Sequence, residues 1–147
     1  MCNFEYYNPN PKKRVRRDGT PMKWHKGDCH VRATAKALGL SWKDTLTTLY
    51  ESALERCDTV GSIDNIAEVL EKNGYKKGVI SKEWMMQRHR RPTIKEVLRD
   101  LGNENMTVLF KCTHHVATAV NGTLYDTWNC SNEVVWRFWY KKTEEDE

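Results

Sequence analysis

The 147-residue sequence contains no long hydrophobic run, and its charge is nearly balanced. Its apolar stretches fall short of the roughly 20 residues that a membrane-spanning helix needs. The N-terminal region also turns polar too early for a secretory signal. We therefore expect a soluble intracellular protein without a membrane partner. The net charge of +4, from 24 basic and 20 acidic residues, does not by itself imply nucleic-acid binding.

Paired cysteines are also missing. The cysteines are odd in number and scattered, and none belongs to a Cys-x-x-Cys pair. This pattern excludes a plausible disulfide framework and favours a reducing, cytoplasmic location. The five residues are Cys2, Cys29, Cys57, Cys112 and Cys130.

The length of the chain fits one domain, which we expect to cover residues 21–141. Residues 1–20 are rich in Pro, Asn and basic side chains, and they predict a flexible basic arm on which the fold does not depend. Residues 142–147 form an acidic tail. The basic runs at 12–17 and 88–91 are interpreted as solvated side chains rather than binding stripes.

Apolar spacing and capping residues predict four helices, with Ser41 and Ser62 at the starts of the second and third. Cys57 closes the apolar stripe of the second helix and is interpreted as structural. Thr93 and Glu96 form the capping box of the fourth. A short strand is expected at 75–80, and 81–91 is left unassigned, with Trp84, Met85 and Met86 as core contacts. The predicted helices cover residues 28–39, 42–56, 63–73 and 94–101.

The pattern then changes to alternating, β-prone residues. Asn121-Gly122 stands between two such runs and predicts a tight hairpin turn. Helices would therefore precede an antiparallel sheet, which makes the fold an α+β domain of N-terminal helices packed on a C-terminal sheet. The predicted strands cover residues 106–111, 115–120, 123–128 and 134–140.

Cys29 lies at the start of the first predicted helix. Unpaired backbone N–H groups and the positive end of the helix dipole would favour its thiolate, which is the nucleophilic form. A single cysteine at a helix start is more often a small buried core residue. The catalytic interpretation therefore requires a base elsewhere in the chain.

The hairpin supplies a candidate base. A two-residue turn pairs Val120 with Thr123 and places His115 on the same face as Asp126, whereas His114 points to the opposite face. A carboxylate that orients an imidazole opposite a thiol is the arrangement that nucleophilic cysteine catalysis requires. The alternative is an ordinary surface pair of His115 and Asp126.

Three short motifs carry a resemblance to a known family: Gly27-Asp28-Cys29 followed by Arg32-Ala33, the run HVATAVNG at 115–122, and YDTW at 125–128. In their order, the sequence resembles the papain-like cysteine peptidases, and more closely their small phage-associated group. The resemblance covers residues 24–140. It implies a papain-like thiol hydrolase that cleaves an amide or isopeptide bond in a protein or peptide substrate without a cofactor, in the host cytoplasm if phage-encoded.

By position, the resemblance implies Cys29 as the nucleophile, His115 as general base and acid, and Asp126 as the orienting residue. Papain-like enzymes commonly place a Gln before the nucleophile to stabilise the oxyanion, but residues 23–26 read Lys-Trp-His-Lys. The backbone N–H of Cys29 could supply one donor, with Trp24, His25 or Lys26 supplying a second. A catalytically inactive binding protein with the same fold stays open as an alternative.

Two other functions compete with this interpretation. A zinc site could use Cys112, His114 and His115, or His25 with Cys29, but adjacent histidines on opposite faces of a strand cannot bind one metal. We therefore expect no metal. A nucleic-acid-binding module could use the basic runs, with Tyr6, Tyr7 and Trp24 as stacking residues, although the predicted sheet has no evident basic face.

Overall fold

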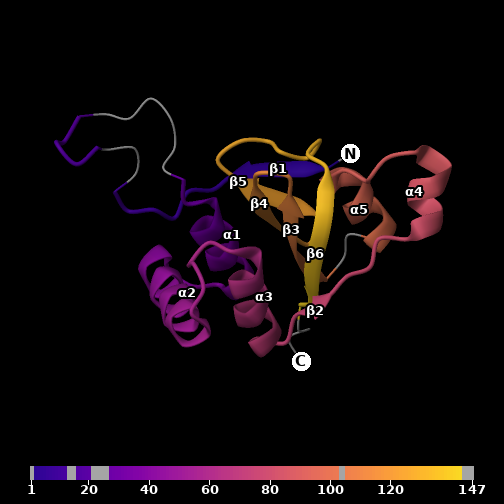
Figure 1. Ribbon diagram of the computed structural model, residues 1–147. Helices are drawn as coiled ribbons and strands as arrows, with labels where there is room; N and C mark the ends of the chain where they lie inside the picture. Colours follow the sequence, from indigo (N-terminus) through magenta and orange to yellow (C-terminus); the bar gives the residue numbers. More distant parts are fainter. Residues whose placement is uncertain (1, 13–15, 21–26, 103–104, 144–147) are drawn as a thin grey trace.

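The computed structural model describes residues 2–12, 16–20, 27–102 and 105–143. These residues form an α+β fold of five helices around a six-stranded mixed sheet with strand order β1-β5-β4-β3-β6-β2 (Figure 1). The helices are α1 Cys29–Leu38, α2 Trp42–Arg56, α3 Ile63–Lys72, α4 Lys82–Arg88 and α5 Ile94–Leu101. The strands are β1 Asn3–Tyr6, β2 Lys76–Lys77, β3 Met106–Cys112, β4 Val116–Val120, β5 Thr123–Asp126 and β6 Val135–Lys142.

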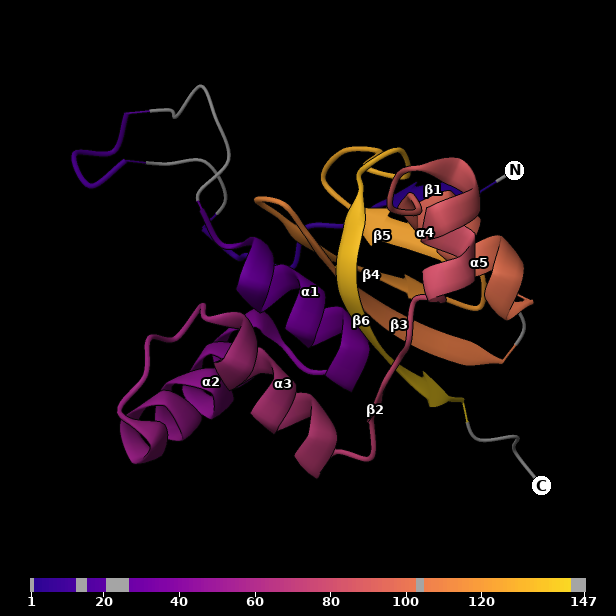
Figure 2. The same ribbon diagram turned by 45° about the vertical axis from the view of Figure 1, so that its right-hand side comes forward.

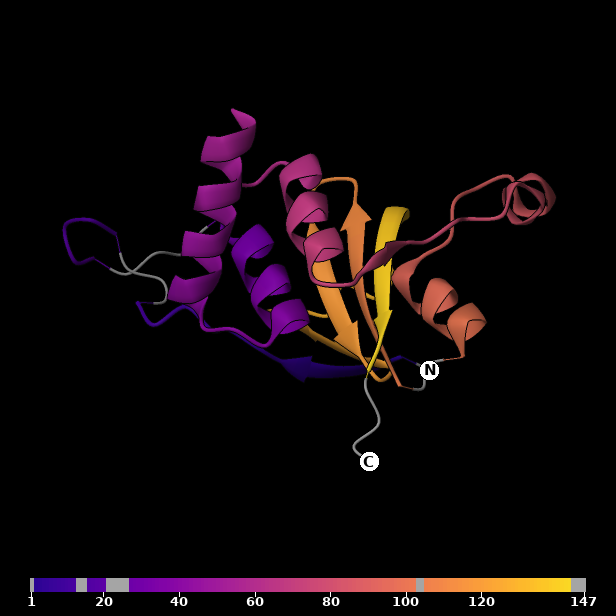
Figure 3. The same ribbon diagram turned by 90° about the horizontal axis from the view of Figure 1, so that it is seen from below.

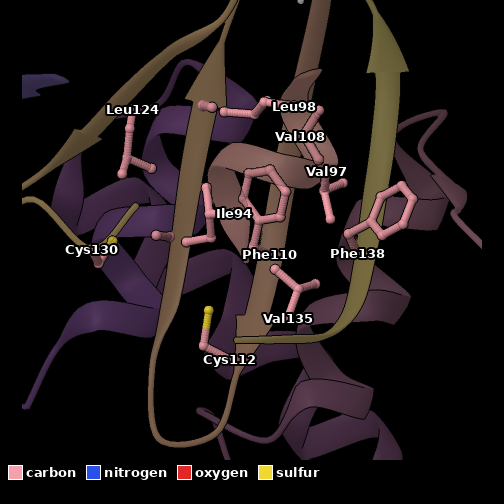
Figure 4. Close-up of a cluster of buried hydrophobic side chains, with 12 residues drawn as sticks. Ile94, Val97, Leu98, Val108, Phe110, Cys112, Leu124, Cys130, Val135 and Phe138 are labelled. Atoms are coloured by element: carbon pink, nitrogen blue, oxygen red, sulfur yellow. The ribbon is translucent and has the colours of Figure 1, made fainter. Parts of the chain in front are cut away.

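Helices cover both faces of the sheet. α1, α2 and α3 lie on one side, and α5 lies on the other, with α4 projecting beyond it (Figures 2 and 3). Side-chain alternation along β3 explains this layering, because Leu109 packs with the α1–α3 side while Val108 and Phe110 pack with α5. Figure 4 shows Phe110 among Ile94, Val97 and Phe138 in the core beneath α5. In the described part of the chain, no helix combines the length and the apolar composition that crossing a bilayer requires.

The N-terminal segment corrects two expectations. Asn3–Tyr6 form β1, which pairs in parallel with β5, so the sheet is mixed rather than purely antiparallel. Asn10 is buried and donates a hydrogen bond from its side chain to Asp28, 3.0 Å away. The first residues are therefore part of the fold. The Pro- and Asn-rich composition of the whole segment hid a four-residue strand that contains Phe4 and Tyr6.

The predicted helix starts are confirmed by their caps. The Ser41 and Ser62 hydroxyls accept hydrogen bonds from the backbone N–H groups of Asp44 and Asn65, each at 3.1 Å. Thr93 and Glu96 form the predicted capping box. These side chains satisfy helix N–H groups that have no acceptor within the helix.

The unassigned segment 81–91 contains α4. The prediction that its large apolar side chains are core contacts is wrong. Trp84 and Met85 are partly exposed, and Met86 is 74% exposed. α4 contains these apolar residues, but it projects from the molecule and has no buried residue (Figure 3). Cys57 is likewise exposed, because it adopts a left-handed conformation that ends α2 instead of completing its apolar face.

The predicted hairpin between β4 and β5 is confirmed. Asn121 and Gly122 both have positive φ angles, 49° and 83°, as a tight primed turn requires. Val120 pairs with Thr123, which is the predicted register. Both strands are shorter than expected: β4 begins after His115, and β5 ends at Asp126.

Candidate active site

The start of α1 places Cys29 against the sheet. Asp28 precedes the helix, and its backbone carbonyl accepts hydrogen bonds from the N–H groups of Val31 and Arg32. Its carboxylate does not cap the helix but turns to Arg32, Asn10 and Trp42. The Asn10 amide and the Trp42 indole each donate to it at 3.0 Å. This anchoring holds the first turn of α1, where the partly exposed Cys29 lines a groove together with His115 and Val116 at the start of β4.

The structure brings His115 and Asp126 together. The Nε2 atom of His115 lies 2.5 Å from Oδ2 of Asp126, across the β4–β5 hairpin. Because Nε2 is occupied by the carboxylate, Nδ1 is the ring nitrogen left for the Cys29 sulfur, and both residues line the same groove. The three residues predicted to form a catalytic triad therefore lie in one contiguous arrangement.

The surroundings of Cys29 favour its thiolate. Burial alone would raise the pKa of the thiol, but hydrogen bonds from His115, His30 and the Val116 backbone outweigh it and lower the pKa to about 6. Burial opposes the charge on His115 as well, yet Asp126 and Cys29 raise the pKa of the imidazole to about 9. At neutral pH the two groups therefore form a thiolate–imidazolium pair.

Asp126 keeps its negative charge despite burial. Burial favours the protonated acid, but hydrogen bonding and charge from His115 hold the pKa of this carboxyl below its usual range, and Arg32 contributes in the same direction. Its Oδ1 atom accepts a hydrogen bond from the Thr127 backbone N–H at 2.7 Å. The Oδ2 atom that faces His115 also lies 3.4 Å from the Cys130 sulfur.

Arg32 is a site residue whose role the sequence did not predict. It is 5% exposed, and its guanidinium contacts Asp28 and lies 3.4 Å from Oδ1 of Asp126. It therefore joins the start of the nucleophile's helix to the carboxylate that orients His115. The four-residue spacing from Asp28 was a visible signal for a helical ion pair. The contact with Asp126, 94 residues away, had no local signal.

Trp128 covers one side of the imidazole. The two ring centroids are 5.2 Å apart with an interplanar angle of 45°, and Trp128 is 42% exposed. Both residues lie just outside the paired strands of the hairpin, so they meet through their rings and not as a backbone pair. The indole shields the imidazole from solvent and restricts its rotation.

The proposed zinc ligands do not converge. Cys112 is buried, His114 is exposed, and His115 is already bound to Asp126. A different group, His115, Asp126 and Cys130, has ligand atoms within 4.8 Å of one another. The short contact between His115 and Asp126 leaves no space for an ion between them. Burial and the Asp126 charge also raise the pKa of the Cys130 thiol, which disfavours the thiolate that a metal would need.

The other cysteines differ from Cys29. Burial raises the pKa of Cys112 to about 12, and burial also raises the pKa of Cys2. In the described residues, Cys29 is thus the cysteine whose thiolate is stabilised. The candidate oxyanion donors that lie outside the described residues are Trp24, His25 and Lys26. The N–H of Cys29, as the first residue of α1, has no acceptor within the helix.

A groove of about 260 Å³ opens beside the thiol. Gly61 forms part of its wall at a tight point, since a Cβ atom there would lie 3.3 Å from the His30 ring. A substrate can therefore reach the sulfur from solvent. The groove is lined by Cys29, His30, Gly61, Ile63, Lys111, Thr113, His114, His115 and Val116.

Comparisons of this chain with models of known protein families, with characterised proteins and with solved structures find no match.

Proposed function

We propose that this protein is a papain-like thiol hydrolase, a cysteine peptidase or isopeptidase that cleaves an amide bond in a protein or peptide. The observation that carries the proposal is the placement of Cys29, at a helix start, on the same groove as His115, whose imidazole is bound to Asp126 across the hairpin. Such an arrangement supplies an activated nucleophile, a proton carrier and an orienting group.

The chemistry needs only these side chains and water. The Cys29 thiolate attacks the carbonyl carbon, forming the C–S bond while the carbonyl π electrons move to oxygen. When the tetrahedral intermediate collapses, the C–N bond breaks and the leaving amine takes a proton from the His115 imidazolium, which leaves a thioester. Neutral His115 then takes a proton from a water molecule whose oxygen forms a C–O bond to the thioester carbon. Collapse of this second tetrahedral intermediate breaks the C–S bond, releases the carboxylic acid and restores the thiolate–imidazolium pair.

The Cys29 N–H is the donor that this geometry offers to the oxyanion. Because the reaction consumes no oxidant or metal, the chain needs no cofactor under this proposal. The nucleophile must stay reduced, and the cysteines are all unpaired, so we propose a reducing, cytoplasmic site of action.

The test is the rate of alkylation of each cysteine as a function of pH, read by mass spectrometry. We expect Cys29 to react first, with one rise in rate near pH 6, where the thiolate forms, and a second near pH 9, where the imidazolium loses its proton. His115→Ala should slow Cys29 labelling at pH 6 by about tenfold or more, because each pKa unit changes the thiolate population about tenfold below the pKa. Exposed Cys57 is the internal reference. Labelling of Cys57 ahead of Cys29 would contradict the proposal.

A further inference from the structure

The groove beside Cys29 continues along the end of the sheet. A second hollow of about 290 Å³ shares Ile63, Lys111 and Thr113 with it and extends to Trp136 and Arg137 at the start of β6. A third hollow of about 570 Å³ shares Trp136 and Arg137 with the second. The three hollows are therefore neighbours in a series that begins at the nucleophile, and this series is called the groove below.

The charged side chains lining this groove are basic. Lys111 lines the first two hollows, Arg137 lines the second and third, and Lys77 and Arg91 line the third. In the described part of the chain, no Asp or Glu lines any of the three. Asp64 lies nearby, 3.8 Å from Arg137, but its side chain is 73% exposed and can turn away into solvent.

Trp136 and Arg91 form an arranged pair within the groove. The Arg91 guanidinium stacks over the Trp136 ring, 4.0 Å from its centroid, and the indole N–H donates to the Thr113 hydroxyl at 3.0 Å. A stacked guanidinium is held flat and keeps its N–H edge free for a carboxylate, which it can bind through two parallel hydrogen bonds. The same stacking occupies a ring face that a nucleic-acid base would use, so the arrangement favours carboxylates.

We propose that this groove binds an acidic polypeptide, so that the substrate carries Asp or Glu residues a few positions away from the bond presented to Cys29. This inference rests on the proposed function and specifies its substrate class. The carboxylates would meet Arg91 and Arg137, while the extended backbone crosses the β3–β4 turn past Lys111. The basic residues thus select the substrate, and Cys29 and His115 supply the chemistry.

The test uses irreversible epoxysuccinyl peptide probes that label Cys29. One series carries two Glu residues on one side or the other of the electrophile, and the matched series carries Gln at the same positions. We expect one Glu probe to label Cys29 about fivefold to tenfold faster than its Gln counterpart at low salt, with the advantage shrinking as added salt screens the charges.

Charge reversal identifies the residues responsible. The double variant Arg91→Glu, Arg137→Glu should remove the Glu advantage, and Arg91→Gln, Arg137→Gln should reduce it if the reversed pair fails to fold. Lys43→Glu is the matched control, because Lys43 is exposed on α2 and does not line the groove. Iodoacetamide labelling of Cys29 should be unchanged in Lys43→Glu, and in each arginine variant the Glu and Gln probe rates are both divided by the iodoacetamide rate of the same protein.

The outcomes separate the two proposals. Equal labelling by Glu and Gln probes, or an advantage that survives in the arginine variants, overturns the acidic substrate even when iodoacetamide labels Cys29 first. Failure of iodoacetamide to prefer Cys29 overturns the hydrolase itself. If a single-stranded oligonucleotide protects Cys29 from labelling and Glu probes have no advantage, the groove binds nucleic acid and the proposal of an acidic polypeptide is refuted.

Discussion

Replacing Asp126 by Asn tests the central contact of the site while nearly preserving its shape. The Oδ1 atom of Asp126 accepts from the Thr127 N–H at 2.7 Å and faces Arg32 at 3.4 Å, so the amide oxygen should take this position in the variant. The amide nitrogen then replaces Oδ2, and it donates to Nε2 of His115 where the carboxylate had accepted. The imidazole must therefore carry its proton on Nδ1, facing Cys29, and can no longer accept the thiol proton there.

The size of the effect follows from the Cys29 pKa. At pH 6 the wild-type thiol, with a pKa of about 6, is about half ionised. Loss of the imidazolium raises that pKa by about one unit or more, which lowers the thiolate population at pH 6 about fivefold or more. Turnover of any acyl substrate should fall further, by about 100-fold or more, because the tautomer is wrong for proton transfer as well.

The assay is the pH profile of Cys29 alkylation in Asp126→Asn beside the wild type. The melting temperature of both proteins is measured in parallel, to verify that the variant is folded. Glu51→Gln, on the exposed side of α2, is the matched change from carboxylate to amide. An unchanged alkylation profile in a folded variant would refute the role of Asp126 and leave a pair of Cys29 and His115.

Three further predictions follow from contacts around the site and the sheet. Arg32→Met should lower the free energy of unfolding by about 3 kcal/mol, measured by urea denaturation, because two buried carboxylates lose their shared cation. Gly78→Ala should lower the free energy of unfolding by about 1–3 kcal/mol, because its Cβ would lie 1.9 Å from the Phe138 ring. Gly27→Ala is the control for the melting temperature, since no described atom lies within 4 Å of a Cβ there. His114→Ala should leave the rate of iodoacetamide labelling of Cys29 within about twofold of the wild type, because His114 is exposed and it is His115, not His114, that bonds to Asp126. A larger loss of rate would contradict the hairpin register.

Local signals predicted the parts of the fold that local chemistry decides. Ser41, Ser62 and the Thr93–Glu96 box placed the helix starts, since a capping side chain acts within four residues. Asn-Gly placed the hairpin, because both turn residues need positive φ angles. From the hairpin register alone, His115 and Asp126 were predicted to share a face, and they lie in contact.

Long-range contacts explain what the sequence did not predict. β1 pairs with β5 across about 120 residues, and no pattern within Asn3–Tyr6 specifies a parallel partner. Arg32 reaches Asp126 only because α1 packs on β4 beside the hairpin. The side chains of α4 were predicted to be core residues because Trp and Met are usually buried, but α4 has no fully buried residue.

The opposite pKa shifts of Cys29 and His115 activate the thiol while leaving the stability of the fold nearly independent of pH in the neutral range. The raised pKa of His115, about 9 against 6.5, contributes stability that is fully present below pH 6.5 and lost as the pH rises through 9. The lowered pKa of Cys29, about 6 against 9.0, contributes stability that is present above pH 9 and lost as the pH falls through 6. Between pH 6.5 and 9, Cys29 and His115 together hold one proton in the folded protein, on the imidazole, and also one in the unfolded chain, on the thiol. Folding moves the proton from sulfur to nitrogen without changing the number of protons bound, so the two pH dependences of the free energy of unfolding cancel. Asp126, which stabilises the imidazolium, can therefore activate the nucleophile across the neutral range with little pH dependence of the stability.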